Sequence, residues 1–153
     1  MSIIQTLTNS FKTDVLIGGM NFSTSNRALT ASTQDAFKIA LYTSLAELDA
    51  TTTAYTALNE VANGSGYTTG GLTLTISQVP TTGGTPTTTA YINFADAVWT
   101  SATFSASGAL IYNSSNANRS VAILSFGGTK TATGTFTVQF PAAGVGSSII
   151  QIA

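Results

Sequence analysis

The chain has 153 residues and a mass of 15.6 kDa, which fits one domain with a single sizeable core. Only 7% of the residues are charged, against a usual share of about 25%, and five basic and six acidic residues leave a net charge of −1. Such a surface has no field to attract nucleic acid, an anionic membrane or a charged substrate, so we expect none of these as partners. It also repels copies of itself only weakly, which favours self-association.

Cysteine and histidine are both absent from the sequence. Without cysteine there is no disulfide framework and no thiolate metal site. Without histidine the commonest general base, the commonest metal ligand and the Ser-His-Asp triad are missing together. The chain also lacks a signal-peptide pattern and any stretch near the ~20 apolar residues of a membrane helix. We therefore expect synthesis in the cytoplasm, no membrane, no metal and no cofactor.

The first predicted element is a short amphipathic helix. Apolar residues recur every four positions, at Ile3, Leu7, Phe11 and Val15. Two glycines at 18–19 follow as a stop signal for the helix. The apolar stripe has two possible partners, its own domain or a neighbouring subunit, and we favour its own domain.

A polar stretch without periodicity follows the helix and reads as a linker or extended arm at 21–34. The predicted organisation is therefore a helix and arm over residues 1–36 and a β domain over residues 37–153.

The clearest predicted strand begins at Phe37. Phe37, Ile39 and Leu41 alternate with Lys38 and other residues, which is the period of a strand with one buried face. Residues 51–61 are predicted as a loop, and the glycines of 63–71 indicate a tight, irregular connection.

Further strand candidates follow to the end of the chain, at 72–79, 90–94, 98–106, 109–113, 120–126, 135–140 and 148–152. Their predicted breaks include Pro80, a long hairpin loop over 81–89, Gly108 and the pair Gly127-Gly128. Short strands separated by turn signals predict an all-β fold, namely an antiparallel β-sandwich, a jelly-roll-like fold or a barrel, with a short N-terminal helix.

Carboxylates are the remaining candidates for catalysis, because two of them can hydrolyse a glycoside. They are Asp14, Asp35, Glu47, Asp49, Glu60 and Asp96. Glu47 and Asp49 lie two residues apart, but their segment reads as a solvated turn. Asp96 follows a strand candidate, where aspartate commonly bonds its own backbone in a turn. We predict no enzymatic activity and assign no catalytic residue.

Two glycine-containing stretches are candidates for phosphate-binding loops, but neither matches a phosphate-binding pattern. Residues 127–130 (Gly-Gly-Thr-Lys) lack the order of a P-loop, and the glycines of 64–70 miss the dinucleotide-binding spacing by one residue. Both join strand candidates, so hairpin loops explain them better. Trp99 and Phe104 have opposite parity on one predicted strand, so we expect one in the core and the other at an edge or interface, and no shared platform for a sugar.

A series of short sequence motifs runs along most of the chain. In chain order they are Phe37-Lys-Ile-Ala-Leu-Tyr-Thr-Ser44, Thr53-Ala-Tyr-Thr56, Asn59-Glu-Val61, Gly66-Tyr-Thr-Thr-Gly-Gly71, Phe94-Ala-Asp96, Trp99-Thr100, Gly108-Ala-Leu-Ile-Tyr112, Phe126-Gly127 and Phe136-Thr-Val-Gln-Phe-Pro141, with Asn9-Ser-Phe-Lys12 and Asn21-Phe22 upstream. In this order the motifs resemble a family of small virion structural proteins of tailed bacteriophages. The resemblance covers most of the chain and rests on the order of the motifs, since each alone is weak.

The resemblance implies a non-enzymatic component of the virion, first of all a capsid decoration or cement protein that contacts the major capsid protein or other virion proteins. A head-tail joining piece, a head fibre or a tail part with a carbohydrate-binding role is the alternative. It also implies a homo-oligomer, with a trimer favoured. The last third departs from charged relatives, because it carries only Arg119 and Lys130.

Overall fold

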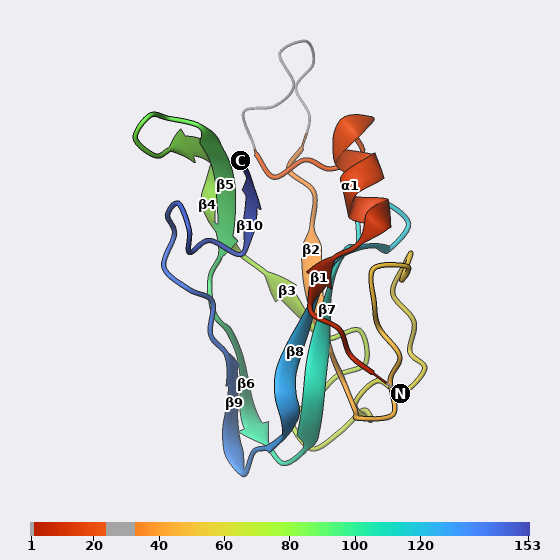
Figure 1. The fold of residues 1–153 in the computed structure, drawn as a ribbon. Coiled ribbons are helices and arrows are strands. Elements are labelled where there is room, and N and C mark those ends of the chain that lie inside the picture. The colour runs from red at the N-terminus through yellow and green to blue at the C-terminus, as the bar shows by residue number, and fades with distance from the viewer. Residues whose placement is uncertain (1, 24–32) are drawn as a thin grey trace.

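The computed structural model describes residues 2–23 and 33–153, so most of the predicted linker at 21–34 lies outside the described residues. The described chain is mostly antiparallel β-structure with one short helix (Figure 1). The predicted all-β, sandwich-like class with a short N-terminal helix is confirmed, and the sheets do not close into a barrel.

The largest sheet has five strands. In spatial order they are β1 (Thr6–Leu7), β8 (Arg119–Thr131), β7 (Ser105–Asn113), β2 (Phe37–Tyr42) and β3 (Leu72–Leu74). All four pairings are antiparallel, and β2 lies next to the centre of the sheet.

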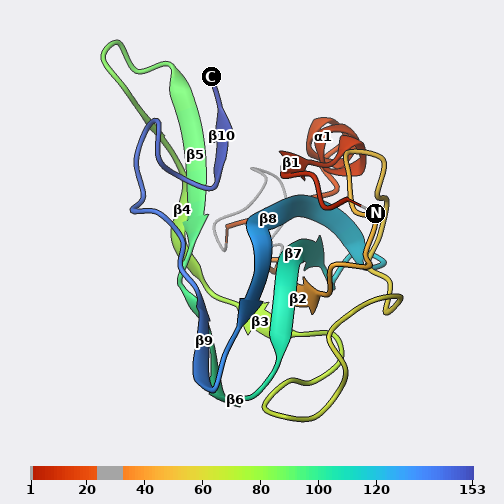
Figure 2. The same cartoon turned by 60° about the horizontal axis from the view of Figure 1, so that its bottom comes forward.

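Two smaller antiparallel sheets lie on one side of this sheet (Figures 1 and 2). One has the order β10 (Ile150–Ile152), β5 (Thr89–Phe94), β4 (Ile76–Gly83), and the other pairs β6 (Ala97–Ala102) with β9 (Gly134–Val138). Because β6 follows β5 after two residues, the two small sheets form one layer of the sandwich.

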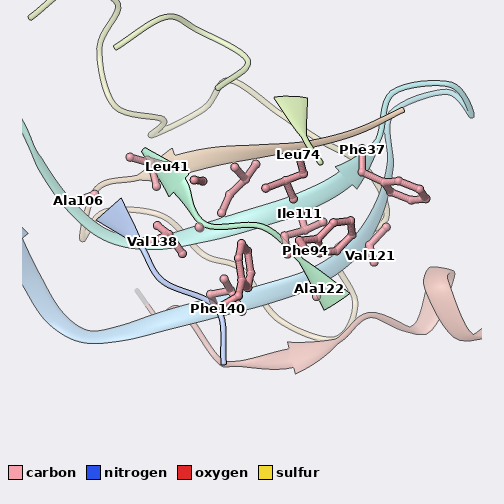
Figure 3. Close-up of a cluster of buried hydrophobic side chains, with 14 of the residues drawn as sticks. Phe37, Leu41, Leu74, Phe94, Ala106, Ile111, Val121, Ala122, Val138 and Phe140 are labelled. Atoms are coloured by element: carbon pink, nitrogen blue, oxygen red, sulfur yellow. The ribbon is translucent and has the colours of Figure 1, made fainter. Parts of the chain in front are cut away.

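The main core lies between the two layers. Phe37, Ile39 and Leu41 of β2 are at most 1% exposed and belong to this core, which confirms the predicted buried face. Figure 3 shows Phe37 and Leu41 on the same side of the sheet as Phe94 and Phe140 of the opposite layer. The period-two rule thus identified the inward side chains of this strand.

A second core lies on the other face of the five-stranded sheet. Ala40 and Tyr42 of β2 and Leu110 of β7 are buried there beneath Leu48 of the loop that follows β2. The central strands are therefore buried on both faces, although their residues do not form a continuous apolar run. The loop residues Ala46, Leu48 and Tyr55 supply the cover that strand periodicity alone does not predict.

The N-terminal segment differs from the predicted helix. Helix α1 spans only Asn9–Leu16, because Thr8 caps it by accepting the backbone N–H of Phe11 through its side chain. Ile3 contacts the second core and β1 pairs with β8, while Phe11 is 3% exposed in the main core. The four-residue stripe is therefore divided between a strand and a helix, and it packs on its own chain.

Three predicted strand breaks are wrong, and two of them lie where the strand pairing is irregular. Strand β4 runs through Pro80 to Gly83, which is tolerated because β4 is an edge strand and its pairing with β5 shifts register on both sides of Gln78. Strand β8 runs through Gly127 and Gly128, whose φ angles of 67° and 135° accompany a shift in its pairing with β7. Both sites are bulges within strands.

Gly108 lies inside β7 and is not the predicted break. A Cβ at this position would come within 2.6 Å of the Leu124 carbonyl oxygen and 2.7 Å of the Ile3 side chain. The glycine thus allows close packing of the N-terminal segment on the sheet.

The predicted strand 98–106 is in turn interrupted between β6 and β7 at 103–104.

Candidate functional site

The carboxylates were the sequence candidates for catalysis, and the structure places most of them in structural contacts. Asp14 is 4% exposed and forms a two-pronged ion pair with Arg119, at 2.9 Å from Oδ1 to Nη2 and 2.8 Å from Oδ2 to Nε. This contact raises the pKa of Arg119. It joins helix α1 to the start of β8.

Asp35 and Asp96 also bind structural donors. Asp35 Oδ2 accepts the backbone N–H of Asn21 and the side-chain amide of Asn113, both at 2.8 Å. Asp96 Oδ1 accepts the backbone N–H of Phe140 at 2.8 Å, and so joins the start of β6 to the end of β9. The Asp96 side chain therefore forms a long-range hydrogen bond in place of the predicted bond to its own turn.

The segment of Glu47 and Asp49 is the turn that the sequence predicts. Asp49 Oδ1 accepts the backbone N–H of Thr51 at 2.7 Å and its hydroxyl at 2.6 Å, and these bonds lower the pKa of Asp49. Glu47 is exposed. This local pattern is an Asx-turn.

Glu60 lies at the centre of a hydrogen-bonded cluster of tyrosines. Its Oε1 accepts the hydroxyl of Tyr67 at 2.6 Å and the backbone N–H of Gly70 at 2.7 Å, and its Oε2 accepts the hydroxyl of Tyr55 at 2.7 Å. Tyr112 completes the cluster by donating to the Gly70 carbonyl at 2.8 Å and stacking on Tyr55 with ring centroids 4.7 Å apart. We call these five residues the Glu60 cluster.

Burial and the nearby Glu60 charge raise the pKa of the tyrosines around this carboxylate. The pKa of Tyr112 rises to about 12, first because of burial and second because of Glu60. The pKa values of Tyr55 and Tyr67 also rise, through burial and through hydrogen bonds to Glu60. The tyrosines therefore stay protonated donors well above neutral pH, and their hydrogen bonds to Glu60 fasten the loop over the sheet.

The Glu60 cluster also brings together several of the sequence motifs on which the family resemblance rests. Four of these motifs supply Tyr55, Glu60, Tyr67 with Gly70, and Tyr112. A fifth motif supplies the neighbouring Tyr42, which donates to the Thr56 carbonyl at 2.5 Å. Sequence reasoning missed this convergence, because a loop of 29 residues between β2 and β3 shows no periodicity. The signal in the sequence that could have indicated this cluster was the recurrence of tyrosine and glycine in the motifs.

The two glycine stretches do not form phosphate loops. Residues 127–130 lie within β8, and the 64–70 loop has the N–H of Gly70 occupied by Glu60. Neither stretch leads into a helix. The predicted hairpin loop at 127–130 is wrong, because these residues lie inside β8, whereas 64–70 belongs to the connection between β2 and β3.

The two aromatic residues examined as a sugar platform both enter the interior. Trp99 is 2% exposed, and the Trp99 and Phe104 rings lie 6.1 Å and 5.2 Å from the Phe136 ring. The expected division between core and edge is wrong, because the chain leaves β6 at Ala102 and the parity rule does not apply across the break.

A groove of about 560 Å³ lies between β8, β9 and the segment before β10. Phe126 and Phe136 line this groove, with ring centroids 5.9 Å apart. Its polar lining includes the exposed Lys130, Gln139 and Gln5, and no carboxylate. Such a surface offers hydrogen bonds and one positive charge, but no acid-base pair.

Within residues 2–23 and 33–153, no group of three or more Asp or Glu residues is placed to hold a metal ion. Over the same part of the chain, no helix has the length and apolar character needed to span a membrane.

Comparisons with known proteins gave no match to a family model, to a curated protein or to a solved structure.

Proposed function

We propose that this protein is a non-enzymatic structural component of a tailed-bacteriophage virion, and first of all a capsid decoration or cement protein. It is made in the cytoplasm of the host bacterium and taken up into the particle. Its partners are the major capsid protein or other virion proteins, together with further copies of itself, for which a trimer is the expected form.

The observation that carries the non-enzymatic part is the use of the carboxylates. Asp14, Asp35 and Asp96 accept hydrogen bonds that join distant segments of the chain, and Glu60 accepts three within its own loop. A general acid or base must reach a substrate proton, and these oxygens are already committed to holding the fold. In a chain without histidine or cysteine, this leaves few groups for catalysis.

The family resemblance supports the assignment to the virion. Several of the sequence motifs behind this resemblance form the Glu60 cluster, so they have a structural role in the fold. The residues of these motifs form a hydrogen-bonded layer over the outer face of the five-stranded sheet. Tyr42 and Tyr112 of the sheet are at most 3% exposed beneath this layer. A scaffold held in this way suits a subunit that must keep its shape while bound on a particle.

The surface also suits a subunit that binds other proteins. Leu16 and Ile17 at the end of α1 are 87% and 74% exposed, and Leu58 in the loop after β2 is 72% exposed. Burying such side chains against a neighbour contributes about 1.5–3 kcal/mol each. The low net charge adds little repulsion between neighbouring copies.

A fibre or tail protein with a carbohydrate-binding role is the second candidate, alongside a head-tail joining piece. The groove between β8 and β9 favours the carbohydrate role, because it combines Phe126 with the free polar side chains of Gln139 and Lys130. A sugar binds through aromatic faces and neutral hydrogen-bonding groups of this kind.

Mass spectrometry of purified particles, with copy numbers scaled to the major capsid protein, tests the proposal. A decoration protein should be present in tens to hundreds of copies that follow the number of capsid subunits. A joining piece or fibre should occur in about a dozen copies or fewer, and absence from the particle contradicts the proposal. A glycan array on the purified protein tests the carbohydrate role separately.

A further inference from the structure

Strand β9 has an open edge that the rest of the described chain leaves unpaired. It pairs only with β6, and the backbone N–H of Phe140 points to the β6 side, where it binds Asp96. Backbone direction alternates along a strand, so Phe136 and Val138 point to the same side. The N–H and C=O groups of the alternate residues, Thr135, Thr137 and Gln139, therefore point away from β6. We call these the free edge of β9.

No described residue binds the backbone groups of this free edge. Figure 1 draws β6 beside β9 and no strand on its other side. The side chains of Thr135, Thr137 and Gln139 are exposed as well.

The outer edge of β6 is also unpaired, but this strand is interrupted by a register shift between Thr100 and Ala102, with Ser101 at a φ of 55°. The remaining strand edges among the described residues are protected. Strands β1, β3 and β10 have only two or three residues. Strand β4 carries Pro80 and two register shifts, and the lower half of β8 carries the positive-φ glycines Gly127 and Gly128 together with Lys130. These are the devices by which proteins prevent unwanted strand pairing. By contrast, β9 has five residues without a charge, a proline or a register shift opposite 135–138.

We propose that the free edge of β9 pairs with the same edge of a second copy of this chain, antiparallel across a two-fold axis. Two identical antiparallel strands are self-complementary by symmetry. With Thr137 opposite Thr137 of the second copy, Thr135 faces Gln139 and every outward N–H and C=O finds a partner. The β6–β9 sheets of the two copies then join into one sheet of four strands.

Charge supports a second copy as the occupant of this edge. Residues 134–141 contain no charged side chain, so the two-fold places no like charges opposite each other along the strand. The whole chain carries a net charge of only −1, so long-range repulsion between copies is weak. This inference does not depend on the virion role, and a three-fold contact elsewhere on the molecule would give a hexamer in place of a dimer.

The test compares Thr137→Pro with Thr137→Ala by sedimentation over a range of concentrations. Proline removes the outward N–H at a strand edge, where it is tolerated in the monomer, whereas alanine keeps the N–H and removes only the side chain. We expect the wild type to form dimers or hexamers, Thr137→Pro to weaken the two-fold association by about tenfold or more, and Thr137→Ala to change it by less than about threefold. Equal behaviour of the two variants, or a wild type that shows only monomers or only trimers, overturns the proposal.

A charge exchange keeps the proposal testable if the proline variant does not fold. Thr137→Lys and Thr137→Glu should each weaken association, because the two-fold places like charges opposite each other, and mixing the two should restore it. Failure of the mixture to associate overturns the pairing. Protection of the Thr137 and Gln139 amides from hydrogen exchange only after addition of another virion protein would replace the second copy by that protein as the occupant.

Discussion

Replacement of Glu60 by alanine tests whether the Glu60 cluster holds the loop on the sheet. The substitution leaves three donors without their acceptor, namely the hydroxyls of Tyr55 and Tyr67 and the N–H of Gly70. An orphaned buried donor costs about 1–3 kcal/mol. Tyr67 is 2% exposed and Gly70 is buried, whereas Tyr55 and Glu60 are half-buried, so water replaces part of the loss.

We therefore expect Glu60→Ala to lower the free energy of unfolding by about 2–4 kcal/mol. Urea unfolding followed by the fluorescence of the single, buried Trp99 measures this change. Glu47→Ala is the matched control, because Glu47 is exposed, and its substitution should stay within about ±0.5 kcal/mol. Equal shifts of the urea midpoint in the two variants would refute the reasoning.

Three further predictions follow from burial and titration. Ile39→Ala should lower the free energy of unfolding by about 2–5 kcal/mol, because Ile39 is fully buried in the main core. Lys38→Ala, at the half-buried neighbouring position, should lower it by less than about 1 kcal/mol. Equal urea midpoints for the two variants would contradict the assignment of these side chains to opposite faces of β2. Removal of residues 1–19 should abolish cooperative thermal unfolding, since it deletes Phe11 from the main core, and a sharp transition near the wild-type temperature would count against this. Stability should be full below about pH 10 and fall above it, because the folded pKa of Tyr112 and its three neighbours lies above the unfolded value near 10; a tyrosinate absorbance for these residues at pH 10 in the folded protein would contradict it.

The sequence predicted the parts of the fold that depend on local alternation. The inward residues of β2 follow from the period of two, because one face of that strand meets the opposite layer. The loop at 51–61 and the irregular glycine connection at 63–71 were also recognised from composition, and the structure has four positive-φ glycines in that connection.

The errors arose where a distant segment decides the local structure. Gly108 stays in a strand because Ile3 packs directly on it, and Pro80 stays in a strand because β4 happens to be at an edge. The N-terminal stripe reads as one helix, but pairing with β8 pulls its first half into β1. No pattern within these segments carries that information.

The candidate site was less accessible to sequence reasoning than the fold. The six carboxylates could be enumerated, but their partners come from segments up to 105 residues away, as in the pair of Asp14 and Arg119. The absence of histidine and cysteine was the stronger guide, because it removed whole classes of chemistry before any geometry was known.

Cryo-electron microscopy of the particle that contains this protein tests the central claim most directly. We predict density for the two-layer sandwich at many symmetry-related positions on the outside of the head, in contact with the major capsid protein. Density confined to the head-tail joint, a fibre or the tail would favour the alternative station. A map at a resolution that identifies all ordered proteins, with no density for this fold, would contradict the assignment to the virion.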